Sequence, residues 1–581
     1  MNLLWIVLPS ALVLGVAYLT YGRLLGRLLR LDPQAPVPAV DLRDGIDFEP
    51  LAPAALLPQH FSAIAAAGPI VGPILAGVLF GWLPALVWII VGSIFVGGVQ
   101  DITSLVASIR HRATSIAEVV RLYMSRRSYL MFLSFIWIAL VYIIVAFTGV
   151  TAASFVGAPL AENGGIGGGA IASSSLIYLG ITLAMGVAMR YAGMPSWLAL
   201  CVFLPMVVGA IVWGPSVPLD LAAITGWSDG AAVKLWSAIL LAYCLVAGVL
   251  PVWLLLQPRG QLGGYFLYAA LAAGALGLAF GNVQVEYPKF RGWNPVAPSG
   301  VGAGVALVPM LFITIACGAC SGFHSLIASG TTSKQLRNEM DAKPVAYGSM
   351  LLEGMVAVVS LCCVMMFKEN SVELAGKPNQ IYAHGIGKFL DVMSVSKGIG
   401  VTFALMAFTT FVYDTLDVCT RLGRFILQEL TGWRGRGGRL FGTALTAGVP
   451  LFFMLRHPSD AKTPVWQLFW NLFGASNQLL AALTLLGVTV WLWRTRRAMW
   501  VWFVTGIPTV IMYVMSTWAL ITMTVPAFRS SEGAWQAPSD VVPWIGLVLL
   551  GLAALMLVEA VRVLAGSGEP PRESGLATAV A

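Results

Sequence analysis

Long apolar runs separated by short polar segments make up most of this chain. A helix needs about 20 largely apolar residues to cross a bilayer, and fifteen runs come close to that length. They lie at residues 3–29, 62–80, 85–109, 130–151, 172–190, 196–213, 235–257, 263–281, 303–328, 345–367, 398–421, 440–456, 475–493, 499–523 and 543–565. The pattern predicts an all-α polytopic membrane protein with about 15 transmembrane helices.

Proline and glycine interrupt two of these runs. The interruptions are at Gly68, Pro69, Gly72 and Pro73 in the first case and at Ala247, Gly248 and Pro251 in the second. Backbone groups freed at membrane depth are tolerated only where they are buried in protein or line a cavity, and broken helices of this kind mark the binding sites of secondary transporters. We therefore predict substrate-binding positions at both interruptions. The alternative is that these residues only bend the helices for packing.

The spacing of the two interrupted runs predicts an inverted repeat. They are five helices apart, so the chain crosses the membrane in opposite directions at the two places, and loops of similar length follow each of them. We expect a leucine-transporter-like five-plus-five core at residues 60–425, with halves at 62–213 and 235–421. A peripheral transmembrane helix at 1–30 and further helices at 440–565 flank this core, and the segment 566–581 is expected to be a disordered tail.

Composition and charge agree with this class and predict an orientation. The chain is 58% hydrophobic and only 10% charged, whereas soluble domains have about 25% charged residues. Most lysines and arginines fall in alternate loops, beginning with Arg23, Arg27 and Arg30. The positive-inside rule then places the N-terminus outside and the C-terminus in the cytoplasm. The net charge of +8 follows from this bias, and no motif for reading nucleic acid accompanies it.

Polar and ionisable residues inside the apolar runs are the candidate sites of ion coupling, because such residues are costly in a membrane. They are Asp101, Ser321, His324, Ser325, Glu353 and Asp417. Glu353 and His324 lie on adjacent predicted helices, which suggests a proton relay. The serine hydroxyls suggest Na⁺ as a possible coupling ion instead. The structural alternatives are a hydrogen bond from Glu353 to a neighbouring helix and an ion pair of Asp417 with Arg421, one helical turn away.

A metal site is a further alternative. Cys317, Cys320 and His324 follow one another at one-turn spacing and would share one face of a helix. Structural zinc sites take four ligands, however, so we expect no metal here. The competing functions are a membrane-embedded metal-dependent enzyme and a nutrient sensor. No ATP-binding motif occurs, which argues against a primary pump. We predict that the chain is no enzyme, because only His324 with Cys320 offers a catalytic pair.

Several longer motifs link these residues to a known family. They are His60–Ala65, Gly68–Pro73, Gln100-Asp101, Leu250–Arg259, Ser321–Thr332, the set Asp417, Thr420, Arg421, Gly423 and Arg424, and Gly474–Gln478. Together they closely resemble the carbon starvation protein A family, within the amino acid–polyamine–cation superfamily. The resemblance implies an importer of peptides or pyruvate in the bacterial cytoplasmic (inner) membrane, with membrane lipid as its other partner. Members usually carry two adjacent histidines where this chain has Gln59 and His60; we include His60 among the substrate-binding candidates.

Overall fold

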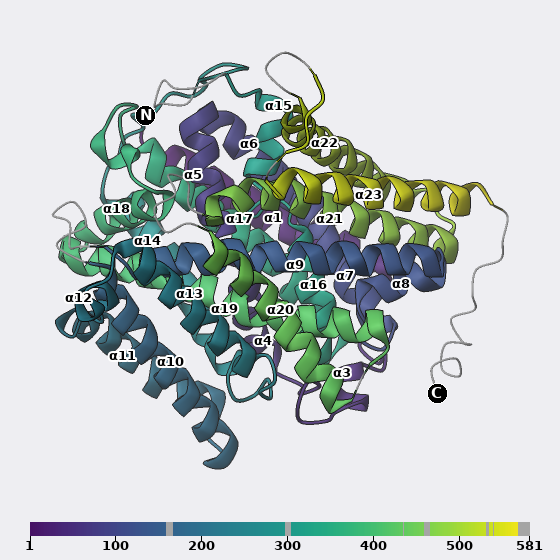
Figure 1. Ribbon diagram of the computed structural model, residues 1–581, viewed down its shortest axis with the longest axis horizontal. Helices are drawn as coiled ribbons and strands as arrows, with labels where there is room; N and C mark the ends of the chain where they lie inside the picture. Colours follow the sequence, from purple (N-terminus) through teal and green to yellow (C-terminus); the bar gives the residue numbers. More distant parts are fainter. Residues whose placement is uncertain are drawn as a thin grey trace.

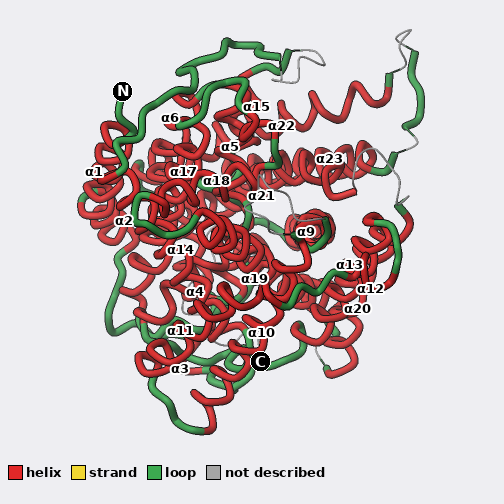
Figure 2. The backbone as a smooth tube through the Cα atoms, turned by 90° about the vertical axis from the view of Figure 1, so that its left-hand side faces the viewer, coloured by secondary structure: helices red, strands yellow, loops and turns green. Residues whose placement is uncertain are grey.

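A computed structural model describes residues 1–157, 167–296, 304–433, 435–457, 465–529, 534–538 and 540–566. Its described residues form helices joined by loops, with three isolated β-bridges and no strand (Figures 1 and 2). The expected tail, apart from Gly566, lies outside the described residues. The prediction of an all-helical polytopic membrane protein is confirmed.

The helices follow the apolar runs, and several begin at a capping residue, as α9 does where Ser125 Oγ accepts a hydrogen bond from Ser128 N at 3.1 Å. In chain order they are α1 (Leu4–Leu19), α2 (Tyr21–Leu29), α3 (Pro38–Asp41), α4 (Pro53–Ala65), α5 (Gly68–Phe80), α6 (Trp82–Gly92), α7 (Gly98–Arg110), α8 (Ile116–Tyr123), α9 (Arg126–Ser154), α10 (Gly168–Tyr191), α11 (Ser196–Trp213), α12 (Leu221–Thr225), α13 (Asp229–Ala247), α14 (Leu256–Phe280), α15 (Leu307–Thr314), α16 (Gly322–Gly330), α17 (Ser349–Met365), α18 (Pro378–Asp391), α19 (Lys397–Thr431), α20 (Arg436–Arg456), α21 (Val465–Arg496), α22 (Ile507–Thr524) and α23 (Val542–Ala565). Two π-helical turns, η1 (Ser93–Gly97) and η6 (Lys343–Gly348), precede α7 and α17.

The number of membrane-length helices is slightly lower than expected. Thirteen helical stretches within the described residues are long and apolar enough to cross a membrane. The pair α4 and α5 is bent by 43° and would make a fourteenth. The expected span 303–328 is instead two short helices, α15 and α16, joined by the linker 315–321. The expected number of about fifteen spans is therefore not confirmed, because the run 303–328 does not form one continuous helix.

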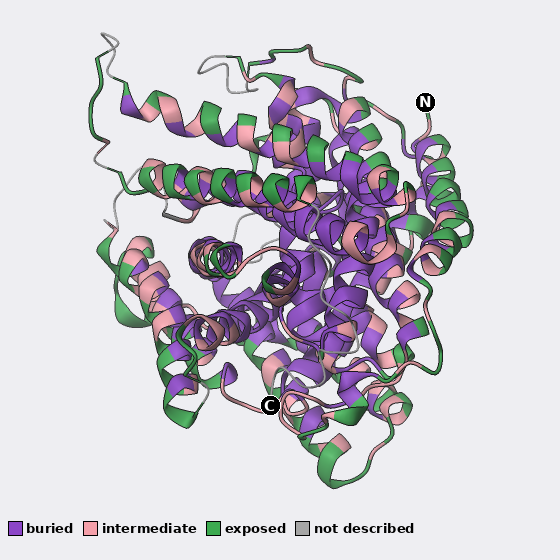
Figure 3. Cartoon of the chain, turned by 90° about the vertical axis from the view of Figure 1, so that its right-hand side faces the viewer, coloured by how far each residue is buried: buried purple, intermediate pink, exposed green. Residues whose placement is uncertain are grey.

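Burial separates inner from outer helices (Figure 3). The helices α17, α19 and α21 are enclosed over most of their apolar length, whereas α1 and α23 expose most of theirs. The expected core ended at residue 425, yet α21 lies beyond that point and contacts α9, α16 and α22. Its position has a physical reason, because the side chains of Asn477 and Gln478 are hydrogen-bonded to the α15–α16 region.

The first interruption lies before the glycine–proline motif. The bend falls at Ala66 and Ala67, and Ala66 has a φ of +40°. The motif itself is helical and starts α5, with Pro69 in the first turn, where a missing N–H costs no helical hydrogen bond. The prediction of a broken helix is thus supported, but its placement at Gly68–Pro73 is wrong.

The second interruption was predicted in the wrong helix. The helix α13 ends at Ala247, and residues 248–255 lead into α14 without a second half-helix. Arg421 Nη2 donates to the carbonyl oxygens of Ala247 at 3.1 Å and Leu250 at 2.5 Å, so an arginine holds these groups. The break that contacts α5 is the linker 315–321, where Gly318 has a φ of +86°. A β-carbon on Gly72 would lie 2.6 Å from the Thr314 carbonyl oxygen.

Candidate functional site

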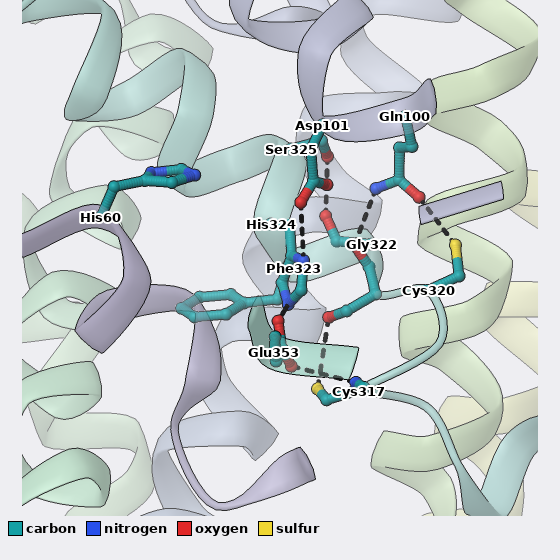
Figure 4. A network of polar contacts seen from close by, with 12 residues as sticks. His60, Gln100, Asp101, Cys317, Cys320, Gly322, Phe323, His324, Ser325 and Glu353 are labelled. Atoms are coloured by element: carbon teal, nitrogen blue, oxygen red, sulfur yellow. Dashed lines mark hydrogen bonds and ion pairs between the residues drawn. The ribbon is translucent and has the colours of Figure 1, made fainter. Parts of the chain in front are cut away.

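The centre of the molecule holds one histidine between two acids (Figure 4). His324 is the third residue of α16, Asp101 lies in the first turn of α7 after the π-helical turn η1, and Glu353 lies on α17. His324 Nδ1 is 3.0 Å from Asp101 Oδ2, and His324 Nε2 is 3.2 Å from Glu353 Oε2. All three side chains are fully buried. Only the Asp101 contact has hydrogen-bond geometry, because His324 Nε2 and Glu353 Oε2 make no hydrogen bond among the described residues. The ring nevertheless lies between two carboxylates, which suits a histidine that exchanges protons with them.

The unwound linker contributes directly to this triad. The backbone N–H of Gly318 donates to Glu353 Oε1 at 3.0 Å. Asp101 Oδ1 has no hydrogen-bond partner among the described residues. The predicted closeness of Glu353 and His324 is confirmed as a contact. Asp101 faces the histidine, whereas Arg110 on the same helix pairs with Glu339 at 2.8 Å.

Polar side chains of α7 and α21 hold the linker in place. Gln100 Nε2 donates to the Ser321 carbonyl oxygen at 2.7 Å, and Asn477 Nδ2 donates to Ser321 Oγ at 3.0 Å. The Ser325 hydroxyl lies 3.0 Å from Thr484 Oγ1, also on α21. The hydroxyls of Ser321 and Ser325 thus contact α21. A Na⁺ site would instead require them to face the first broken helix.

The cysteines near His324 do not share a helical face. Residues 315–321 are not helical. The spacing of Cys317, Cys320 and His324 therefore does not place them on one helical face. Cys320 Sγ faces Gln100 Oε1 at 3.0 Å instead. Ligand atoms of Cys317, His324 and Glu353 lie within 4.8 Å of one another, a spacing that a metal ion could bridge. Both nitrogens of His324 already face carboxylates, however, which favours a proton as the occupant.

His60 lies apart from both interruptions. It belongs to α4, six residues before the bend at Ala66, and its Nδ1 lies 2.8 Å from Thr332 Oγ1. Its neighbour Gln59 donates to Gln335 Oε1 at 3.0 Å. Figure 4 shows the His60 ring outside the network of dashed contacts around His324. These contacts connect α4 to the segment that follows α16.

A second buried network joins α13, α14 and α19. Arg259, in the first turn of α14 and fully buried, forms an ion pair with Asp417 of α19. Tyr243 OH donates to Asp417 Oδ2 at 2.6 Å and accepts from Arg259 Nη1 at 2.7 Å. The guanidinium lies 4.3 Å from the ring centre of Tyr413. The structural alternative for Asp417, an ion pair with Arg421, is not what the structure shows, because Arg259 takes that place.

Arg421 instead binds a segment that precedes α4. We call residues 45–52 the latch. Asp47 of the latch lies 3.0 Å from Arg421 and 3.4 Å from Arg424. Its burial opposes ionisation, yet the two guanidinium groups hold the pKa of Asp47 below its usual value. Leu51 N donates to the Gln335 carbonyl oxygen at 2.9 Å, and Val252 N donates to that of Ile46 at 3.0 Å. The latch therefore connects three parts of the chain.

A cavity of about 420 Å³ lies at the other end of α19. Val71 of α5, Phe408 of α19 and Trp470 of α21 are among its apolar lining residues, and Lys377 and Gln380 add polar groups. Phe408 and Arg421 are thirteen residues apart on one helix, which is about 20 Å at 1.5 Å per residue. The cavity and the latch are therefore separate features, the cavity nearer the N-terminal end of α19 and the latch nearer its C-terminal end.

Membrane-length helices around buried charges, beside an interrupted helix, are typical of a polytopic membrane transporter. The family described as Carbon starvation protein CstA matches residues 2–375 and 365–519. The chain belongs to this family.

Named relatives are similar over most of their length. The peptide transporter CstA of Helicobacter pylori (strain J99) is 32% identical, over 91% of this chain and 83% of the relative. The pyruvate/proton symporter BtsT of Escherichia coli (strain K12) is 29% identical, over 89% and 81%. The peptide transporter CstA of Bacillus subtilis (strain 168) is 29% identical over 97% of both chains. Among solved structures, a manganese transporter of Eremococcus coleocola aligns with a TM-score of 0.46 at 14% identity, over 90% of this chain and 99% of that one.

Proposed function

We propose that this protein is a secondary active transporter that imports small carboxylate-bearing nutrients, peptides or pyruvate, together with protons. The observation that carries the proposal is the buried chain Asp101–His324–Glu353 beside the unwound linker 315–321. A histidine that faces a carboxylate on each side can accept a proton from one acid and pass it to the other. The name of the Escherichia coli relative, a pyruvate/proton symporter, supports H⁺ rather than Na⁺ as the coupling ion.

The proposed substrate site lies where the two broken helices meet. The N-terminal ends of α5 and α16 carry partial positive charge, which favours a carboxylate group. We propose that Gly68, Pro69, Gly72 and Pro73 contribute by allowing α5 to approach the linker closely, because a β-carbon on Gly68 would lie 2.2 Å from Cys317 Cβ. Ala247, Gly248 and Pro251 are no longer candidates for this site, because an arginine holds the end of α13.

We propose an inverted repeat with boundaries that replace 62–213 and 235–421. One half runs from α4 to α14, and within it α10 and α11 are additional helices without a counterpart in the other half. The other half runs from α15 to α21. Three features support this division. Each half begins with a broken helix, the next helix contains a π-helical turn, and the long helices α9 and α19 contact each other.

We propose that the N-terminus lies outside and the C-terminus in the cytoplasm. The latch, with Arg421 and Arg424, then faces the cytoplasm, and the cavity beside Lys377 opens outside. Exposed apolar side chains such as Trp5 on α1, which is 77% exposed, would contact lipid.

Uptake by the purified protein in proteoliposomes tests the function. Labelled pyruvate and labelled dialanine are each offered with a pH gradient, with a Na⁺ gradient and in counterflow without any gradient. We expect accumulation of at least one substrate with the pH gradient alone. Glu353→Gln should keep counterflow but lose accumulation, because it retains the shape of the side chain without its titration. Accumulation that requires Na⁺, or full accumulation by Glu353→Gln, would contradict proton coupling through the triad.

A further inference from the structure

A second acid lies beneath the cavity and takes no part in the triad. Phe408 of α19 lines the cavity. Asp414 lies six residues further along the same helix, about 9 Å deeper at 1.5 Å per residue. Its side chain is 1% exposed. Asp414 Oδ2 accepts a hydrogen bond from Ser62 Oγ of α4 at 2.9 Å, and Asp414 Oδ1 has no partner among the described residues.

Asp414 forms no ion pair with any described residue, although two arginines lie in the neighbouring networks. Arg259 of α14 pairs with Asp417, which Tyr243 of α13 also binds. Arg421, one turn beyond Asp417, pairs with Asp47. A buried carboxylate without a paired cation is costly unless it is protonated.

The hydrogen bonds indicate which acid carries the proton. Asp417 receives an ion pair and a tyrosine hydroxyl, both of which stabilise a carboxylate. Asp414 receives only the Ser62 hydroxyl. The remaining titratable neighbours are Tyr413 and Tyr178, and the latter donates its hydroxyl to the Arg259 carbonyl oxygen at 3.0 Å. A neutral Asp414 beside an ionised Asp417 avoids the cost of a buried carboxylate that has no cation of its own.

We propose that Asp414 is a second proton-binding group of the transport path. Its carboxylate takes a proton from water on the cavity side, forming an O–H bond, and releases that proton to water on the latch side. Ser62 connects this acid to α4, the half-helix that the 43° bend separates from α5. Movement of α4 would therefore remove a hydrogen bond from Asp414 and change its access to water. The role in transport rests on the proposed proton coupling, whereas the binding of a proton does not.

Infrared difference spectroscopy tests proton binding without any substrate. Spectra of the purified full-length protein in lipid are recorded at low and high pH. We expect a C=O band of a protonated carboxyl group that Asp414→Asn lacks. Glu429→Gln is the matched control, because Glu429 lies on the same helix and also accepts one serine hydroxyl, that of Ser115 at 2.6 Å. This variant should retain the band. An Asp414→Asn spectrum with the band unchanged, or loss of the wild-type band on addition of Na⁺ at constant pH, would overturn the proposal.

Transport stoichiometry gives the second measurement. The number of protons per substrate, obtained from the reversal potential in proteoliposomes, should fall by one in Asp414→Asn, with counterflow retained. Glu429→Gln should match the wild type. An unchanged proton number in Asp414→Asn would refute its role in coupling. If the wild-type protein moves neither pyruvate nor dialanine but still shows the band, the proposed function fails while Asp414 stands as a proton site.

Discussion

Gly72→Ala should weaken the contact between the two broken helices. The added β-carbon would lie 2.6 Å from the Thr314 carbonyl oxygen and 3.3 Å from Ile315 Cα. Contacts of a β-carbon below 3.0 Å essentially do not occur, so α5 and the linker must separate by at least about 0.4 Å. Both contacts are backbone atoms, which no rotamer change can move away.

The magnitude follows from the cost of overpacking, about 1–3 kcal/mol. The displaced linker also carries Gly318, whose N–H donates to Glu353, so uptake should fall together with stability. The assays are SDS titration of the unfolding equilibrium and initial uptake by proteoliposomes containing equal amounts of protein. Gly180→Ala on α10 is the control, because a β-carbon there would meet nothing within 4 Å. That change should be neutral or stabilising by up to about 1 kcal/mol.

Two outcomes would refute this reasoning. Gly72→Ala could prove as stable as Gly180→Ala, which would mean that the close approach to Thr314 has no energetic consequence. A loss of uptake at unchanged stability would instead favour the hypothesis drawn from the sequence, in which Gly72 serves substrate binding rather than packing.

Two further predictions concern buried charges. Arg259→Met should destabilise the protein by about 3–5 kcal/mol in the same titration, because it leaves Asp417 buried without its cation; Arg259→Met with Asp417→Leu should recover most of this loss, and failure to recover would show that the pair is not the cause. Burial lowers the pKa of Lys334 to about 8 from 10.5, so between these values the unfolded chain binds more protons than the folded one. Thermal stability should therefore rise from pH 8 towards 10.5, and Lys334→Met should flatten this rise; an equal rise in both proteins would contradict it.

The helices and part of the triad could be predicted from the sequence. Apolar length identifies helices directly, and the adjacency of the runs that contain His324 and Glu353 was enough to predict their contact. Asp101 was a candidate because an acid in an apolar run is costly and because it belongs to the motif Gln100-Asp101. Its bond to His324 depends on how α7 and α16 pack, which no local pattern encodes.

The misplaced features have particular physical causes. Prolines in the first turn of a helix look like breaks in sequence, yet Pro69 lies in the first turn of α5. Arg259 entered only as the end of the motif Leu250–Arg259, and nothing in the sequence indicated that it is fully buried in α14. The second break is the linker 315–321. The only indication of it in the sequence is Gly318, a glycine within an apolar run. The enclosure of α21 depends on hydrogen bonds of Asn477 and Gln478 to distant backbone groups.

The latch has a consequence for the speed of the transport cycle. Its bonds to Arg421, Gln335 and Val252 join parts of the chain that must separate if the latch end of the protein opens. Energy spent on breaking these bonds returns when they re-form, so they leave the overall driving force unchanged and act on the rate of each turnover. Every 1.4 kcal/mol of latch stability would reduce the open population about tenfold. Selection on this short segment would thus adjust how fast the carrier works without altering what it carries.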